Sequence, residues 1–98
     1  MPTLSAYTNT ENTALVILKD LGYRCWHDKE SELCCCEKSG WDFSANSFTE
    51  LLGVVRIYEY HQPKEYREYW WKIDEPWLKD SVPTEAPDYA PVWKSDTP

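Results

Sequence analysis

The sequence predicts one small α+β domain, in which a helix, a β-hairpin and a second helix form the core. Two segments, 8–22 and 46–63, carry apolar residues at helical spacing between capping signals. Between them lie short runs rich in Cys and aromatic residues, a pattern typical of strands. The length of 98 residues is enough for a single domain with one modest core.

The first helix is expected over residues 8–22, TNTENTALVILKDLG. Thr8 and its two polar neighbours offer oxygens for an N-cap, and Gly22 follows the last apolar residue as a stop. The apolar positions are Ala14, Leu15, Leu18 and Leu21, widened by Val16 and Ile17. We therefore expect most of this helix to be buried.

The runs YRCWHD and LCCCEKSGWDF, separated by the polar KESE, predict a β-hairpin. With a four-residue loop over 29–32, Asp28 pairs with Leu33. A two-residue loop would shift the register and change every cross-strand pair. With the longer loop, the pairs on one face are Cys25 with Cys36 and His27 with Cys34.

The second helix is expected over residues 46–63. Ser47 and Glu50 have the spacing of a capping box, and apolar residues follow at helical spacing. Gly53 inside the helix suggests that another element approaches closely there. The β-branched and aromatic run 54–60 leaves a short helix followed by a strand as an alternative.

Residues 63–73, PKEYREYWWKI, are compatible with a helix, which we favour, and with a strand. In the helix Tyr66 and Trp70 face the core, whereas Tyr60 and Trp71 point outward. After residue 74 the composition changes, because five of the seven prolines follow. We expect the domain to cover residues 1–75. Residues 76–98 are expected to form an extended proline-rich tail. The tail is either disordered or packed on the domain, in which case Trp77 and Trp93 would hold it there.

The charge and hydropathy of the chain exclude some function classes. The formal net charge is −7, which argues against nucleic acid and favours a basic protein partner. No apolar run is long enough to span a membrane, and the start of the chain does not resemble a secretory signal. We therefore expect a cytoplasmic protein with no membrane association.

The four cysteines and one histidine of the hairpin are the candidates for metal chemistry. Cys25, His27, Cys34 and Cys36 would face one another and could hold zinc, but the C-x-H and C-C-C spacings lack the usual paired knuckles. The sequence contains no nucleotide-binding, metalloprotease or C-x-x-C motif. We expect no cofactor and no enzyme activity, with a metal- or redox-responsive domain as an alternative.

Aromatic and acidic residues are the candidates for binding a partner, because Tyr, Trp and complementary charge are typical of interfaces. By analogy of size and charge with small acidic inhibitors and immunity proteins, we expect a bacterial or phage protein-interaction module. A small-ligand binder is a further alternative, and a homodimer is compatible with the small sheet. The candidate residues are Tyr60, Trp71, Trp77, Asp28, Glu30 and Glu32.

Overall fold

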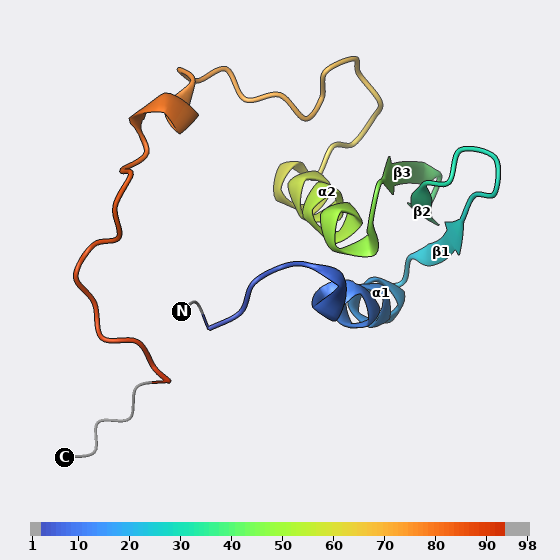
Figure 1. Cartoon of the computed structure of the whole chain (residues 1–98). Coiled ribbons are helices and arrows are strands. Elements are labelled where there is room, and N and C mark those ends of the chain that lie inside the picture. The colour runs from blue at the N-terminus through green and yellow to red at the C-terminus, as the bar shows by residue number, and fades with distance from the viewer. Residues whose placement is uncertain (1–2, 94–98) are drawn as a thin grey trace. The chain divides into compact units, whose positions relative to one another are not determined.

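A computed structural model describes residues 3–93 (Figure 1). Contacts divide the chain into two units: a body over Ala6–Trp71, and the flanking segments, of which residues 3–5 and 72–93 are described. The ends of the predicted domain and tail, residues 1–2 and 94–98, lie outside the described residues. The two units are described separately below.

The body confirms the α+β class, with two α-helices and a three-stranded antiparallel sheet of order β1-β2-β3. A short 3-10 turn, η1, precedes the first helix over Thr8–Thr10. The elements that follow are α1 (Glu11–Asp20), β1 (Arg24–His27), β2 (Cys34–Lys38), β3 (Trp41–Ala45) and α2 (Phe48–His61).

The end of α1 follows the sequence prediction. Gly22 adopts a φ of 96° and donates its N–H to the Lys19 carbonyl at 3.0 Å. Tyr23 donates its N–H to the Leu18 carbonyl at 3.0 Å. These two bonds form a Schellman motif, whose left-handed residue favours glycine because it lacks a Cβ. Gly22 therefore ends the helix and turns the chain into β1.

The expectation that most of α1 is buried is wrong. Only Ala14 and Leu18 are buried in this helix, and the other apolar side chains are partly or largely exposed. The physical reason is that the small body covers one side of α1 alone, where α2 and β1 contact it. The exposed apolar residues of the segment are Val16, Ile17 and Leu21.

The β1–β2 hairpin has the predicted four-residue loop and register. Asp28 donates its N–H to the Leu33 carbonyl at 2.9 Å. Glu32 closes the loop with a left-handed φ of 62°. The pairs Cys25 with Cys36 and His27 with Cys34 are both present, so the hairpin prediction is confirmed.

The third strand, β3, is an element that the sequence prediction did not separate from β2. Lys38 pairs with Trp41 across a two-residue turn, in which Ser39 and Gly40 have φ values of 54° and 88°. Positive φ at both positions defines the type I′ turn that matches the twist of a hairpin. The Ser-Gly dipeptide therefore ends β2 and starts a second hairpin.

The second helix, α2, begins at the predicted capping residue. Ser47 Oγ accepts a hydrogen bond from the Glu50 N–H at 3.1 Å. The helix continues to His61, so the alternative of a strand over 54–60 is wrong. The close approach expected at Gly53 is also wrong, because a Cβ added there meets nothing within 4 Å.

Neither a helix nor a strand forms over residues 63–73. Bends and a turn replace it, with the Trp70 N–H bonded to the Arg67 carbonyl at 3.1 Å and Tyr69 at a φ of 60°. Pro63 and the left-handed Gln62 stop α2, and the Trp70 ring in the segment that follows packs against the core. In residues 72–93 the single regular element is a 3-10 turn, η2, over Leu78–Ser81.

The core lies between the helices and one face of the sheet (Figure 1). The opposite face carries two cross-strand rows, Arg24–Glu37–Asp42 and Trp26–Cys35–Ser44, and no helix of the body packs on it. Within residues 3–93, no helix is long and apolar enough to cross a membrane. The largest fully buried side chains of the described residues are Leu18, Leu51, Val55 and Cys36.

Candidate aromatic binding surface

Trp70 is the centre of a ring network at the end of the sheet that holds the β2–β3 turn. Its ring is edge-on to four neighbours, with centroid distances from 5.5 to 6.4 Å. Edge-to-face pairs at such distances stabilise aromatic clusters beyond their buried area, typically by about 0.5–1.5 kcal/mol per pair. The four neighbours are Trp41, Phe43, Tyr58 and His61.

The loop that carries Trp70, residues 62–71, is fastened at both ends by hydrogen bonds. Gln62 has a left-handed φ of 48° and donates its N–H to the Tyr58 carbonyl at 2.9 Å. His61 Nε2 is hydrogen-bonded to the Trp71 carbonyl at 2.9 Å. The first bond ends α2, and the second connects the last turn of α2 to the end of the loop that carries the aromatic side chains.

Four aromatic side chains around this loop are exposed. Their exposed fractions range from 51% to 74%. Tyr60 packs edge-on to His61, and Tyr69 packs edge-on to Trp71, with centroids 5.4 and 6.1 Å apart. We call this set the aromatic surface; it consists of Tyr60, Tyr66, Tyr69 and Trp71.

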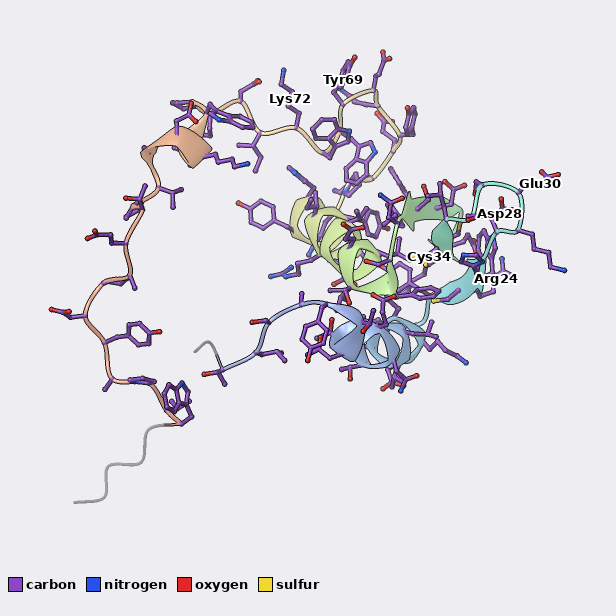
Figure 2. The ribbon with its side chains drawn as sticks, viewed as in Figure 1. Arg24, Asp28, Glu30, Cys34, Tyr69 and Lys72 are labelled. Atoms are coloured by element: carbon purple, nitrogen blue, oxygen red, sulfur yellow. The ribbon has the colours of Figure 1, made fainter. Side chains whose placement is uncertain are left out.

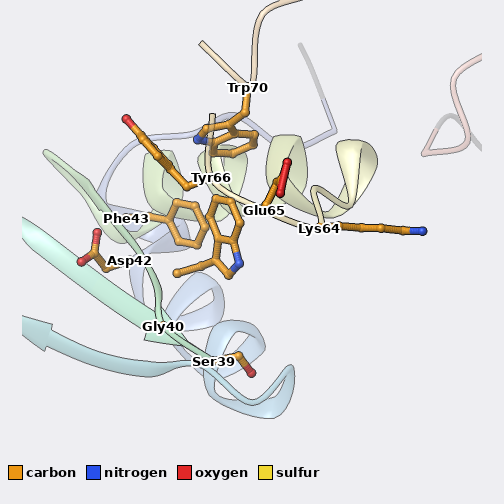
Figure 3. A pocket seen from close by; sticks show the side chains of 9 residues that line it. Ser39, Gly40, Asp42, Phe43, Lys64, Glu65, Tyr66 and Trp70 are labelled. Atoms are coloured by element: carbon orange, nitrogen blue, oxygen red, sulfur yellow. The ribbon is translucent and has the colours of Figure 1, made fainter. Parts of the chain in front are cut away.

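A hollow of about 390 Å³ opens beside the aromatic surface (Figure 3). The Lys64 side chain extends away from the rings in this view. Glu65 lies in the lining, and its carboxylate is paired with Arg67 at 3.1 Å. We call this hollow the aromatic pocket; its lining is Ser39, Gly40, Trp41, Asp42, Phe43, Lys64, Glu65, Tyr66 and Trp70.

The predicted aromatic residues have mixed outcomes. Tyr60 and Trp71 are 68% and 51% exposed, as expected for interface positions, and Trp70 is half-buried against the core. The prediction that Tyr66 belongs to the core is wrong, because its side chain is 74% exposed. Trp77 lies in the other unit, where it is exposed and precedes η2.

The acidic loop between β1 and β2 is at the opposite end of the sheet from Tyr69 (Figure 2). Asp28 Oδ2 accepts hydrogen bonds from the Ser31 N–H at 2.7 Å and from Ser31 Oγ at 2.8 Å. These bonds lower the pKa of Asp28 and use its carboxylate to shape the loop. Glu30 and Glu32 are exposed and remain the acidic groups available to a partner.

The Cys and His side chains of the hairpin share a face, but they do not assemble a metal site. Cys34 and Cys36 are buried, Cys25 is half-buried and His27 is exposed. In residues 3–93, no group of three or more His, Cys, Asp or Glu side chains is placed to hold a metal ion.

Burial also disfavours reactive thiols in this hairpin. It raises the pKa of Cys25 and Cys34, and it raises the pKa of Cys36 to about 12. The thiolate is the form that attacks electrophiles and binds metal ions. At neutral pH these three thiols are therefore protonated and act as small apolar core residues.

The sequence prediction missed Trp41, Tyr66 and Tyr69 as members of the site. The Ser-Gly dipeptide before Trp41 was the available signal, since it marks the turn that brings Trp41 onto a new strand beside the loop. No comparable signal marks Tyr66.

Comparison of the chain with protein-family models, with curated proteins and with solved structures finds no match.

Proposed function

We propose that this chain is a protein-interaction module that binds its partner through the aromatic surface and has no catalytic activity of its own. The observation that carries the proposal is the exposure of four aromatic side chains around a loop fastened by hydrogen bonds. Tyr and Trp supply large contact area and are enriched at binding hot spots. The hydrogen bonds at the two ends of the loop restrain its backbone, which lowers the entropy that binding would otherwise cost.

The charge of the chain supports a basic partner. The chain contains seventeen acidic and ten basic residues, and Glu30 and Glu32 project from the exposed β1–β2 loop. Such a field increases the rate at which a cationic protein associates, even where the charged loop is not the main contact. We propose that the chain acts as an inhibitor or immunity-type protein, that is, a small acidic protein that occupies a basic site of its partner.

Capture of the partner by the tagged full chain from an extract of the source cells tests the proposal. We expect Tyr60→Ala and Trp71→Ala to lose the partner, and Glu30→Lys to slow its association. Tyr7→Ala is the matched control, because Tyr7 is 67% exposed but lies outside the aromatic surface. Equal recovery of one partner by both aromatic variants and the control would contradict the proposal.

A further inference from the structure

β3 is an edge strand whose outer side is open. Lys38 and Trp41 close the two-residue turn and form a hydrogen-bonded pair. In an antiparallel ladder such pairs alternate, so Trp41 and Phe43 direct their backbone N–H and C=O groups to β2. Asp42 and Ser44 therefore direct their N–H and C=O groups away from the sheet. Within residues 3–93 neither backbone has a hydrogen-bond partner on that side.

The aromatic pocket adjoins this open edge. Trp41 and Phe43 belong to β3 itself and line the pocket on the helix-covered face of the sheet. Tyr66 and Trp70 of the loop complete the aromatic wall (Figure 3). A strand placed against β3 would direct alternate side chains to this face, at the position of the pocket.

The other face of the same edge carries a carboxylate. Asp42 pairs across the strands with Glu37, and Glu37 is in turn neutralised by an ion pair with Arg24. Asp42 has no ion pair or side-chain hydrogen bond among the described residues. A strand added to β3 would therefore place its second set of side chains beside an uncompensated negative charge.

We infer that β3 receives an extended segment of a basic partner as a fourth strand. This inference rests on the proposed function and names the segment that the partner supplies. Backbone hydrogen bonds to Asp42 and Ser44 would provide affinity, and one side chain in the aromatic pocket would provide specificity. A basic residue on the opposite face would pair with Asp42, in agreement with the net charge of −7. The inference names β3 rather than β1, the other edge of the sheet, because the aromatic pocket is lined by residues of β3.

Titration of the full chain with a short synthetic peptide of alternating arginine and valine tests the inference. We expect saturable binding, with the amide NMR signals of Asp42 and Ser44 among those that shift most. The same peptide with glutamate in place of arginine should not bind. Absence of saturable binding at millimolar concentrations of the arginine peptide, or shifts confined to other parts of the body, would overturn the inference.

Two substitutions at one position separate the backbone contact from other effects. Ser44→Pro removes an N–H that points away from the sheet, so the β2–β3 ladder is preserved. Ser44→Val keeps the N–H and suits a strand. We expect the Pro variant to lose the peptide and the Val variant to keep it, with unfolding curves showing that both are folded.

Two further variants keep the test decisive if Ser44→Pro does not fold. Asp42→Lys should weaken binding of the arginine peptide by about two- to fivefold, from the usual strength of exposed charge pairs. Tyr66→Ala, which truncates an exposed wall of the aromatic pocket, should also weaken it. Unchanged affinity in both variants would overturn strand addition at β3.

The captured cellular partner separates this inference from the proposed function. If Ser44→Pro binds that partner as tightly as Ser44→Val, strand addition is wrong and the proposed function stands. If Tyr60→Ala and Trp71→Ala also keep the partner, the proposed function itself is wrong.

Discussion

Glu11, in the first turn of α1, caps the N-terminus of α2. Its Oε1 and Oε2 atoms accept hydrogen bonds from the backbone N–H groups of Phe48 and Thr49, at 2.8 and 3.0 Å. The first N–H groups of a helix have no partner within it and attract negative charge. One carboxylate therefore satisfies two of these donors and joins the starts of the two helices, 37 residues apart in sequence.

Replacing Glu11 by Ala should lower the free energy of unfolding by about 1–2 kcal/mol, because two helix-end donors lose a charged acceptor. Glu11→Gln is the control, since its single amide oxygen can still accept one of the bonds. We expect the Gln variant to fall between the wild type and Glu11→Ala in denaturant unfolding. Equal stability of all three chains would contradict the capping role.

The same contact should make stability depend on pH. Burial alone would raise the pKa of Glu11, but the hydrogen bonds from Phe48 and Thr49 outweigh it and lower the pKa below its usual 4.5. The Glu11 carboxylate therefore binds a proton more readily in the unfolded chain than in the folded one. The stabilisation by its hydrogen bonds is complete above about pH 4.5 and is lost as the pH falls further. The stability difference between wild type and Glu11→Gln, measured from pH 7 to pH 3, should shrink over that acidic range.

The hairpin shows what the sequence could predict. The register of β1 and β2 follows from a polar four-residue loop between two strand-forming runs, and these signals are local. The same local logic applies to the caps at Ser47 and Gly22. Local signals were not sufficient everywhere, because the Ser39-Gly40 turn was missed and Thr10, the N-cap of α1, makes no side-chain capping bond.

The aromatic loop shows why the rest was missed. Its spacing favours a helix and also fits a strand, whereas the actual path depends on contacts between distant residues. Trp70 packs against Trp41 and Phe43 of β3, a strand that was itself not predicted. Tyr69 adopts a left-handed backbone conformation, which the sequence does not predict because the residue is neither glycine nor asparagine. The candidate site was predicted in part, through Tyr60 and Trp71, whereas its pocket depends on this tertiary arrangement.

Two glycines should respond in opposite directions to substitution by alanine. Gly53 has room for a Cβ in the middle of α2, so Gly53→Ala should stabilise the chain by about 1 kcal/mol. Gly40 also has room, but its φ of 88° is unfavourable for any side chain. Gly40→Ala should therefore destabilise by about 1 kcal/mol. Thermal unfolding of the two variants measures whether each substitution raises or lowers the stability. A loss of stability in Gly53→Ala would show that the helix constrains this position in another way.

Tyr23 should make the chain sensitive to alkaline pH. Its ring is buried, and its hydroxyl donates to Glu59 Oε2 at 3.2 Å. Burial first, and then the Glu59 carboxylate, raise the pKa of Tyr23 well above its usual range.

The unfolded chain releases this proton first, so the stabilisation is present below about pH 10 and decreases above it. Wild type should therefore lose stability between pH 9 and pH 11 relative to Tyr23→Phe, which has no proton to release there. A constant difference between the two chains over that range would show that the hydroxyl does not titrate with unfolding.

Cys36 should be the slowest thiol to react in the folded chain. It is fully buried between the sheet and the helices, and burial raises its pKa to about 12. Cys35, the next residue in β2, lies on the opposite face of the sheet and is half-buried. Iodoacetamide at neutral pH, followed by peptide mapping, should therefore label Cys35 well before Cys36, and unfolding should remove most of that difference.

The role of Cys36 as an apolar core residue has a second consequence. Cys36→Ala leaves a small cavity, whereas Cys36→Ser introduces a hydroxyl at a fully buried position lined by apolar side chains. A buried hydroxyl without a partner costs about 1–3 kcal/mol, so the Ser variant should be the less stable of the two. If Cys36→Ser were as stable as wild type and Cys36 reacted rapidly in the folded chain, the thiol would have to be accessible, and the hairpin would open in solution.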